Sequence, residues 1–160
     1  MNSSHRQQGI TLLSLIFALI IITVVTSIAT AAYTGYVQQS HIKKVEGSLL
    51  VVQNAIRNFA EDQNTYVGIC NAASVLAIQV PGKDNNFTYQ CLSKPTDSTY
   101  AVGAVGVCPG QFCGLTLAFA DRGQGKGYKE STTSVPKGWI KPTKPCWIAG
   151  SDGSCSTAQF

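Results

Sequence analysis

The sequence lacks the residue combinations that most enzymes use for catalysis. It has two histidines: His5 lies in the polar stretch before the first apolar run, and His41 stands alone on a predicted helix. No nucleophile–base pair is recognisable, and GQGKG at residues 123–127 lacks the Gly-x-x-x-x-Gly-Lys-Ser/Thr spacing of a phosphate-binding loop. The acidic residues of the predicted turns do not have the spacing of a calcium loop. We therefore expect no enzymatic activity, no cofactor and no bound metal.

Charged residues are scarce as well. They make up 12% of the 160 residues, about half the share usual for a soluble domain. None lies between Ile10 and Ala32, and a helix over this run would be roughly 35 Å long, enough to cross a bilayer core of about 30 Å. The sequence therefore predicts a short polar leader over 1–9, a transmembrane and assembly helix over 10–32, and a globular head over 33–160 that includes an amphipathic continuation of the helix.

The six cysteines all follow the apolar run, and their even number indicates disulfides formed in an oxidising compartment. Zinc binding and free thiols are the alternatives. Zinc is disfavoured because there is no Cys-x-x-Cys pair and His41 is far from the cysteines in the sequence. Although the sequence leaves the connectivity open, pairing of nearest neighbours would close three local loops. These expected pairs are Cys70–Cys91, Cys108–Cys113 and Cys146–Cys155.

Apolar periodicity predicts one long helix from Ile10 to Asp62. In its second half an apolar stripe recurs at spacings of three and four, formed by Ile42, Val45, Leu49, Val52, Ile56 and Phe59. Polar residues are expected on the other faces: Lys43, Lys44, Glu46, Gln53, Asn54 and Arg57. A helix that is apolar on one side needs a second layer to cover that side.

The second layer is predicted to be a sheet. Phe87–Cys91, Tyr100–Val107 and Leu115–Ala120 have the composition or alternation of strands and are separated by turn-forming stretches. We expect an α+β fold in which three or four antiparallel strands pack on the long helix. The segment 123–160 is expected to be mostly irregular and stapled by Cys146–Cys155, with Trp139 and Trp147 anchoring it on the sheet.

Basic residues are concentrated in one part of the predicted head. Between residues 122 and 144 only Glu130 opposes them, and they are Arg122, Lys126, Lys129, Lys137, Lys141 and Lys144. Two interpretations are open: a solvated, loop-rich face, or a patch that binds a polyanion such as DNA.

The N-terminal junction RQQG-ITLLSL resembles the class III leader junction of type IV prepilins and pseudopilins, in which a basic residue and a glycine precede the apolar helix. TAAYTGYVQQ extends the resemblance, since Tyr33 and Tyr36 stand where pilins often carry aromatics. The resemblance is strong through about residue 65 and only architectural beyond it. It implies that Gly9 ends the leader, and that Ile10, in place of the usual phenylalanine, is the first mature residue. A prepilin peptidase would cleave there and methylate the new amino terminus.

One position departs from the family pattern. Pilins usually carry a glutamate five residues into the mature chain, where it neutralises the amino terminus of a neighbouring subunit, and this chain has Ser14 there. Members without that glutamate are chiefly minor or tip-like subunits. The resemblance therefore implies a minor pilin.

The resemblance also implies partners and a location. The chain would be a structural subunit of a type IV pilus used for pilus biogenesis, twitching motility or adhesion, and its partners would be other pilin subunits, the prepilin peptidase and an inner-membrane assembly platform. It would be embedded in the bacterial inner membrane as a single-pass protein with its head in the periplasm, and would become part of the extracellular pilus after assembly. The alternatives are a competence pilin that binds DNA for uptake through the basic residues, and a pseudopilin of a type II secretion system.

Overall fold

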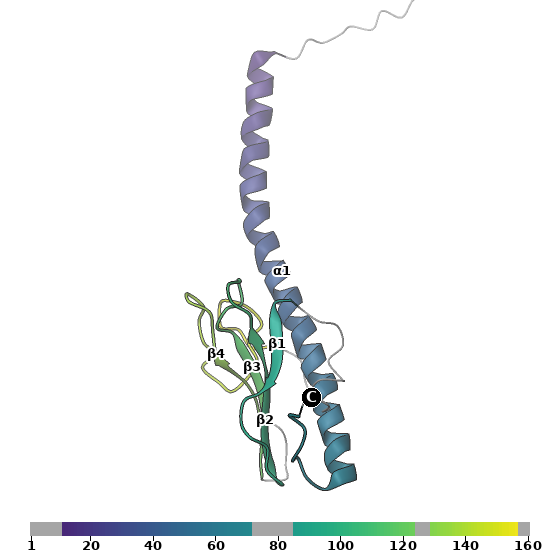
Figure 1. Cartoon of the computed structure of the whole chain (residues 1–160). Coiled ribbons are helices and arrows are strands. Elements are labelled where there is room, and N and C mark those ends of the chain that lie inside the picture. The colour runs from purple at the N-terminus through teal and green to yellow at the C-terminus, as the bar shows by residue number, and fades with distance from the viewer. Residues whose placement is uncertain (1–10, 72–84, 124–128, 157–160) are drawn as a thin grey trace, which may run out of the picture. The chain divides into compact units, whose positions relative to one another are not determined.

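The computed structural model describes residues 11–71, 85–123 and 129–156. This part of the chain contains one helix followed by four strands (Figure 1): α1 (Leu12–Gln63), β1 (Phe87–Cys91), β2 (Thr99–Gly106), β3 (Thr116–Arg122) and β4 (Lys129–Ser134). The chain forms two compact units, residues 1–37 and 38–160, so the boundary between them falls inside α1.

α1 runs from Leu12 to Gln63, close to the predicted helix. It contains no proline, so no residue of it lacks the backbone N–H that a helix requires. The helix ends because Asn64 adopts a left-handed conformation with φ of 52°. Its N–H donates to the carbonyl oxygen of Ala60 at 2.8 Å, which gives one of the last turn's carbonyls a partner.

The second half of α1 packs one face against the sheet. The predicted stripe is confirmed: five of its members are completely buried, namely Ile42, Val45, Leu49, Val52 and Ile56, and Phe59 is half-buried against them. The expectation that Glu46 and Gln53 lie on the exposed faces is wrong, because only 4% and 8% of their surfaces are exposed. Both follow stripe residues at a helical spacing of four, and such residues share a face.

The four strands form one antiparallel sheet in the order β1-β2-β3-β4, with each strand next to its neighbour in the sequence. Figure 1 shows the sheet as one layer beside the second half of α1. Opposite Tyr100, Val102 and Ala104 on β2 stand Asp121, Phe119 and Leu117 on β3. Because side chains alternate between the faces of a strand, these pairs lie on the same face. The predicted α+β class with an antiparallel sheet is therefore confirmed.

The fourth strand corrects part of the prediction. Residues 123–160 were expected to be mostly irregular, yet Lys129–Ser134 forms β4 along the edge of β3. The signal in the sequence is weak, since KESTTS contains no large apolar residue. Its Thr132 is nevertheless only 4% exposed, because the chain beyond β4 returns along this strand. Thr132 donates its N–H to the carbonyl oxygen of Cys146 at 2.9 Å.

Three disulfides close local loops of the second unit, and they are the nearest-neighbour pairs expected from the sequence: Cys70–Cys91, Cys108–Cys113 and Cys146–Cys155. The first joins the segment after α1 to β1, the second closes the turn between β2 and β3, and the third closes a C-terminal hairpin. No described cysteine is free. Each bond restricts the unfolded chain and so stabilises segments that have little core of their own.

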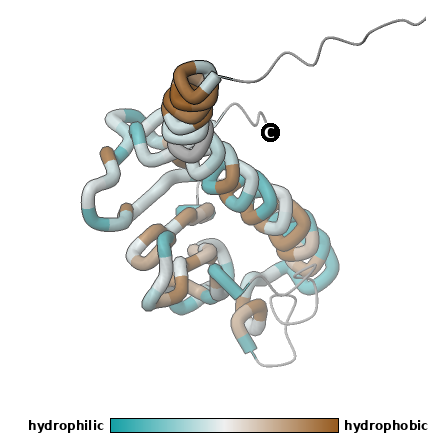
Figure 2. The backbone as a smooth tube through the Cα atoms, turned by 90° about the horizontal axis from the view of Figure 1, so that it is seen from above, coloured by the Kyte–Doolittle hydropathy of each residue, from teal (hydrophilic) through white to brown (hydrophobic). Residues whose placement is uncertain are grey.

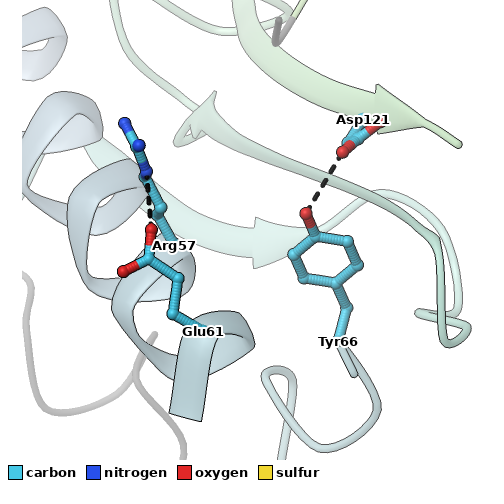
Figure 3. Close-up of polar contacts among 4 residues, drawn as sticks. All are labelled: Arg57, Glu61, Tyr66 and Asp121. Carbon is cyan, nitrogen blue, oxygen red and sulfur yellow. Dashed lines mark hydrogen bonds and ion pairs between the residues drawn. The ribbon is translucent and has the colours of Figure 1, made fainter. Parts of the chain in front are cut away.

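A polar contact fastens the segment after α1 to the sheet. Figure 3 shows Tyr66 pointing its hydroxyl at Asp121, to which it donates a hydrogen bond of 3.1 Å. The Tyr66 ring also packs on Tyr100, with centroids 4.5 Å apart. The ion pair between Arg57 and Glu61 in the same figure is exposed and joins neighbouring turns of α1, so it contributes little. Tyr66 thus fixes where the chain leaves the helix.

The expectation of a membrane-spanning helix over 10–32 has to be corrected. In residues 11–71, 85–123 and 129–156 no helix has both the length and the apolar character needed to cross a bilayer. This finding contradicts the predicted location of the chain as a single-pass protein of the inner membrane.

The C-terminal hairpin is anchored through Trp147, which is 2% exposed and donates its indole N–H to the carbonyl oxygen of Ala118 at 2.9 Å. Replacing Trp147 with phenylalanine keeps an aromatic ring but removes this donor, so we expect the free energy of unfolding to fall by about 1–3 kcal/mol. Chemical denaturation of the full chain measures it. Trp139→Phe is the matched control, because that half-buried ring packs on Phe112 with centroids 6.2 Å apart. Equal losses in the two variants would contradict the assignment.

Candidate functional site

The first turn of α1 is capped by its own residues. Thr11 precedes the helix, and its hydroxyl oxygen accepts a hydrogen bond of 3.4 Å from the N–H of Ser14. The Ser14 hydroxyl donates back to the carbonyl oxygen of Thr11 at 2.8 Å. This is the local geometry of an N-terminal cap, with serine at the third helical position, where glutamate is often found. The Ser14 side chain is therefore bonded within its own turn.

Three further hydroxyls described in this half of α1 behave in the same way. Thr23 and Ser27 donate to carbonyl oxygens three residues earlier at 2.8 Å and 2.7 Å, and Thr26 donates to the carbonyl oxygen of Ile22 at 2.9 Å. A hydroxyl bonded to its own helix needs no partner from another chain. The polar side chains described here consequently leave the surface of the helix apolar.

That apolar surface is exposed on every side. Each large apolar side chain between Leu12 and Val25 is between 45% and 77% exposed, and the tube in Figure 2 is brown around the first turns of α1. They are Leu12, Leu13, Leu15, Ile16, Phe17, Leu19, Ile20, Ile21, Ile22, Val24 and Val25. Because successive residues of a helix are turned by about 100°, they cover its whole circumference. We call this set the apolar collar.

The collar has a clear energetic consequence. Burying one such side chain fully is worth about 1.5–3 kcal/mol, so the exposed collar strongly favours any contact that removes it from water. A helix that is apolar all round is normally enclosed by other apolar groups, whereas a one-sided stripe needs a single partner. Tyr33 and Tyr36 continue the exposed surface beyond the collar, at 69% and 70%. This arrangement is typical of a helix that is enclosed on all sides by other apolar groups.

The remaining predicted site residues are distributed differently. Gly9, Ile10 and Lys126 lie outside the described residues, and Lys129 begins β4 with a side chain that the structure does not describe. The other basic side chains of the predicted patch are exposed, namely Arg122, Lys137, Lys141 and Lys144.

These exposed basic residues do not gather at one point. Arg122 ends β3 at the end of the β3–β4 ladder where Ala120 pairs with Lys129. Lys141 donates its ammonium to the carbonyl oxygen of Thr133 at 2.9 Å, near the opposite end of that ladder. One of the predicted DNA contacts is thus already engaged with the protein's own backbone.

Sequence reasoning missed a pair of partly buried carboxylates in the second unit. Glu46 on α1 accepts a hydrogen bond of 2.8 Å from the hydroxyl of Ser156. Burial raises the pKa of Glu46, although the Ser156 bond and Lys43 oppose the shift. Burial, and secondarily the charge of Glu46, raise the pKa of Glu130 on β4 from 4.5 to about 7. The helical spacing from Ile42 to Glu46 was the signal that could have revealed the first of them.

No family model, no curated protein and no solved structure matches this chain. In the part of the chain that the structure describes, no group of three or more histidine, cysteine, aspartate or glutamate side chains is placed to hold a metal ion. The apolar collar is therefore the feature from which a function is argued.

The collar predicts self-association of the full chain in aqueous solution. A charge at its centre, Ile21→Asp, should disrupt association, because a buried carboxylate without a partner is strongly unfavourable. Val51→Asp is the control: Val51 is also an exposed apolar residue of α1, at 41% against 62% for Ile21, but it lies outside the collar. Sedimentation velocity and electron microscopy measure the outcome. Association that survives Ile21→Asp and fails with Val51→Asp would show that the collar is not the contact surface.

Proposed function

We propose that this chain is a structural subunit of the type IV pilin kind, which assembles into a helical filament by packing its collar against the helices of other subunits. The observation that carries the proposal is the helix that is apolar around its whole circumference over Leu12–Val25. A single docking partner would leave part of such a surface in water. Several neighbouring helices would enclose it, as in the core of a bundle.

The build of the second unit supports this proposal. The head has a core of its own, centred on the sheet and the second half of α1, and its three disulfides lie away from the collar in sequence. The collar can therefore be covered without taking any side chain from that core. This separation suits a subunit whose head must stay folded while its collar becomes buried against other subunits.

The first turn supports a minor subunit rather than a major one. In the family that the leader junction resembles, a glutamate at the position of Ser14 pairs with a neighbour's amino terminus. Here the Ser14 hydroxyl is bonded to Thr11 within the same turn, and the first turn of α1 contains no acidic residue. Such a chain offers no carboxylate to a neighbour. It suits a place in the filament where this pairing is not needed.

The proposed partners follow from the same reading: other pilin subunits along the collar, a prepilin peptidase at Gly9–Ile10, and the machinery that assembles the filament. A type II secretion pseudopilin would use the same collar and is the alternative within this structural class; the three disulfides favour a pilus. DNA binding has less support, because Arg122 and Lys141 lie toward opposite ends of the β3–β4 ladder. Deleting the gene and scoring piliation, twitching and transformation together would separate the three.

Processing of the leader tests the family assignment itself. We expect Gly9→Ala to block removal of residues 1–9 when the full chain is expressed in a cell that has a prepilin peptidase, because glycine at the last leader position belongs to the junction on which the resemblance to prepilins rests. Intact-mass spectrometry distinguishes the precursor from a mature chain that begins at a methylated Ile10. Ser4→Ala, elsewhere in the same leader, should be processed normally. Normal processing and assembly of Gly9→Ala would refute the proposal.

A further inference from the structure

A buried hydrogen bond in the second unit joins α1 to the C-terminal hairpin, and β4 places a second carboxylate on the face of the sheet toward α1. Glu46 comes from α1, Glu130 from β4, and Ser156 from the C-terminal hairpin over residues 146–156; together we call them the acidic seam. The hairpin is held by the Cys146–Cys155 disulfide and by a backbone bond of 2.7 Å from Ser156 to Trp147. Its Ser156 hydroxyl donates to Glu46 Oε2 at 2.8 Å. The seam thus joins the end of the described chain to the long helix.

Glu46 is only half satisfied at this position. Its side chain is 4% exposed, and among the described residues its second oxygen, Oε1, is buried and has no hydrogen-bond partner. An ionised carboxylate spreads its charge over both oxygens, so a bare buried oxygen makes the charged form costly. Burial therefore favours the neutral form of Glu46, although the hydrogen bond from Ser156 favours the ionised form.

Glu130 approaches from the opposite layer. It pairs with Phe119 across the β3–β4 ladder, and Thr132 pairs with Leu117. Phe119 and Leu117 are completely buried in the core against α1, so Glu130 and Thr132 lie on the face of the sheet that faces the helix. Two carboxylates from facing layers are consequently directed into one region.

The charges around the pair do not balance it. Lys43, one turn before Glu46 on the same helix, is the cation that acts on Glu46, and the hydroxyl of Ser156 is the hairpin's contribution. The charge that acts on Glu130 is Glu46 itself. Among the side chains that the structure describes, Lys43 is the one cation that acts on the two carboxylates, so the pair carries an excess negative charge when both are ionised.

β4 is bonded directly to the hairpin through Thr132. Thr132, two residues from Glu130, donates its N–H to Cys146 O at 2.9 Å and accepts a bond of 2.8 Å from the N–H of Ile148 through its hydroxyl. The hairpin therefore rests on β4 through Thr132 and on α1 through Ser156. Repulsion between Glu46 and Glu130 would therefore act between α1 and β4, the two elements to which the hairpin is bonded.

We propose that the acidic seam is a proton-dependent latch: a proton on the Glu46–Glu130 pair keeps the C-terminal hairpin closed on α1 and β4, and loss of that proton releases it. The occupant of the latch is the hairpin itself, and no metal or co-reactant is required. The seam lies wholly within the second unit, so the latch does not depend on filament assembly.

The direction of the effect follows from the two carboxylates. Burial first, and then the charge of Glu46, raise the pKa of Glu130 from 4.5 to about 7, and burial raises the pKa of Glu46 as well. A raised pKa means that the folded state holds the proton more tightly than the unfolded state. The stabilisation is complete below the ordinary value of 4.5 and is lost as the pH rises through about 7. The latch is closed in acid and opens on the alkaline side of neutrality.

Trp147 reports on the hairpin directly, because it is 2% exposed and is one of two tryptophans. The experiment uses the full chain carrying Trp139→Phe, kept dispersed with a non-ionic detergent because of the exposed collar. Acrylamide quenching of Trp147 and the Tm are measured from about pH 5 to about pH 8.5. We expect quenching to increase and the Tm to fall with a midpoint near 7, the value to which the pKa of Glu130 is raised.

Variants decide whether the seam causes this transition. Glu130→Gln should abolish the transition near pH 7 and leave Trp147 shielded there, because it removes the ionisation whose pKa is raised to about 7. Glu46→Gln should do the same where it folds, and Glu130→Gln alone suffices where it does not. Glu61→Gln is the matched control, since it removes one carboxylate from the exposed side of α1 and should keep the transition. A flat profile in the parent chain, or a transition that persists in Glu130→Gln, would overturn the proposal.

Discussion

The rest of the structure depends on one constraint: a single uninterrupted helix must be covered in two different ways. From Ile42 to Ile56 its apolar residues form one stripe, which one sheet covers completely. From Leu12 to Val25 they surround the helix, and none of them is buried. No residue described in the first unit covers this part of the helix. Folding of the head and covering of the collar therefore involve different surfaces of α1, the stripe in its second half and the collar in its first half.

The head solves its problem with few residues. Four short strands in sequential order need only local connections, and the three disulfides each close a loop within the head. Tyr66 and Trp147 then join the ends of the head to the sheet through bonds to Asp121 and Ala118. Side-chain hydrogen bonds thus hold segments whose sequence provides little apolar surface. The sheet is the common attachment for all of them.

How much the sequence could predict depended on the kind of interaction. The stripe and three of the strands follow from local patterns of period and alternation. The disulfide pairs do not follow from the sequence, which leaves their connectivity open, but they agree with pairing of nearest neighbours. β4 could not be predicted in this way, because KESTTS is polar and becomes a strand only through its pairing with β3. The charge of Glu46 predicts an exposed position, whereas its helical spacing of four from Ile42 puts it on the buried face. The approach of Glu130 to Glu46 depends on register between distant segments, which no local pattern encodes.

Polar side chains in the two halves of α1 have different hydrogen-bond partners. The surface proposed for assembly and the groups proposed to respond to pH therefore lie on different parts of the helix. In the first half the hydroxyls of Ser14, Thr23 and Thr26 bond to their own backbone. In the second half Glu46 reaches another segment and remains partly unsatisfied. We therefore expect a change of pH to act on the head through the acidic seam. A filament built from such subunits would keep its core while its surface segments respond to the surroundings.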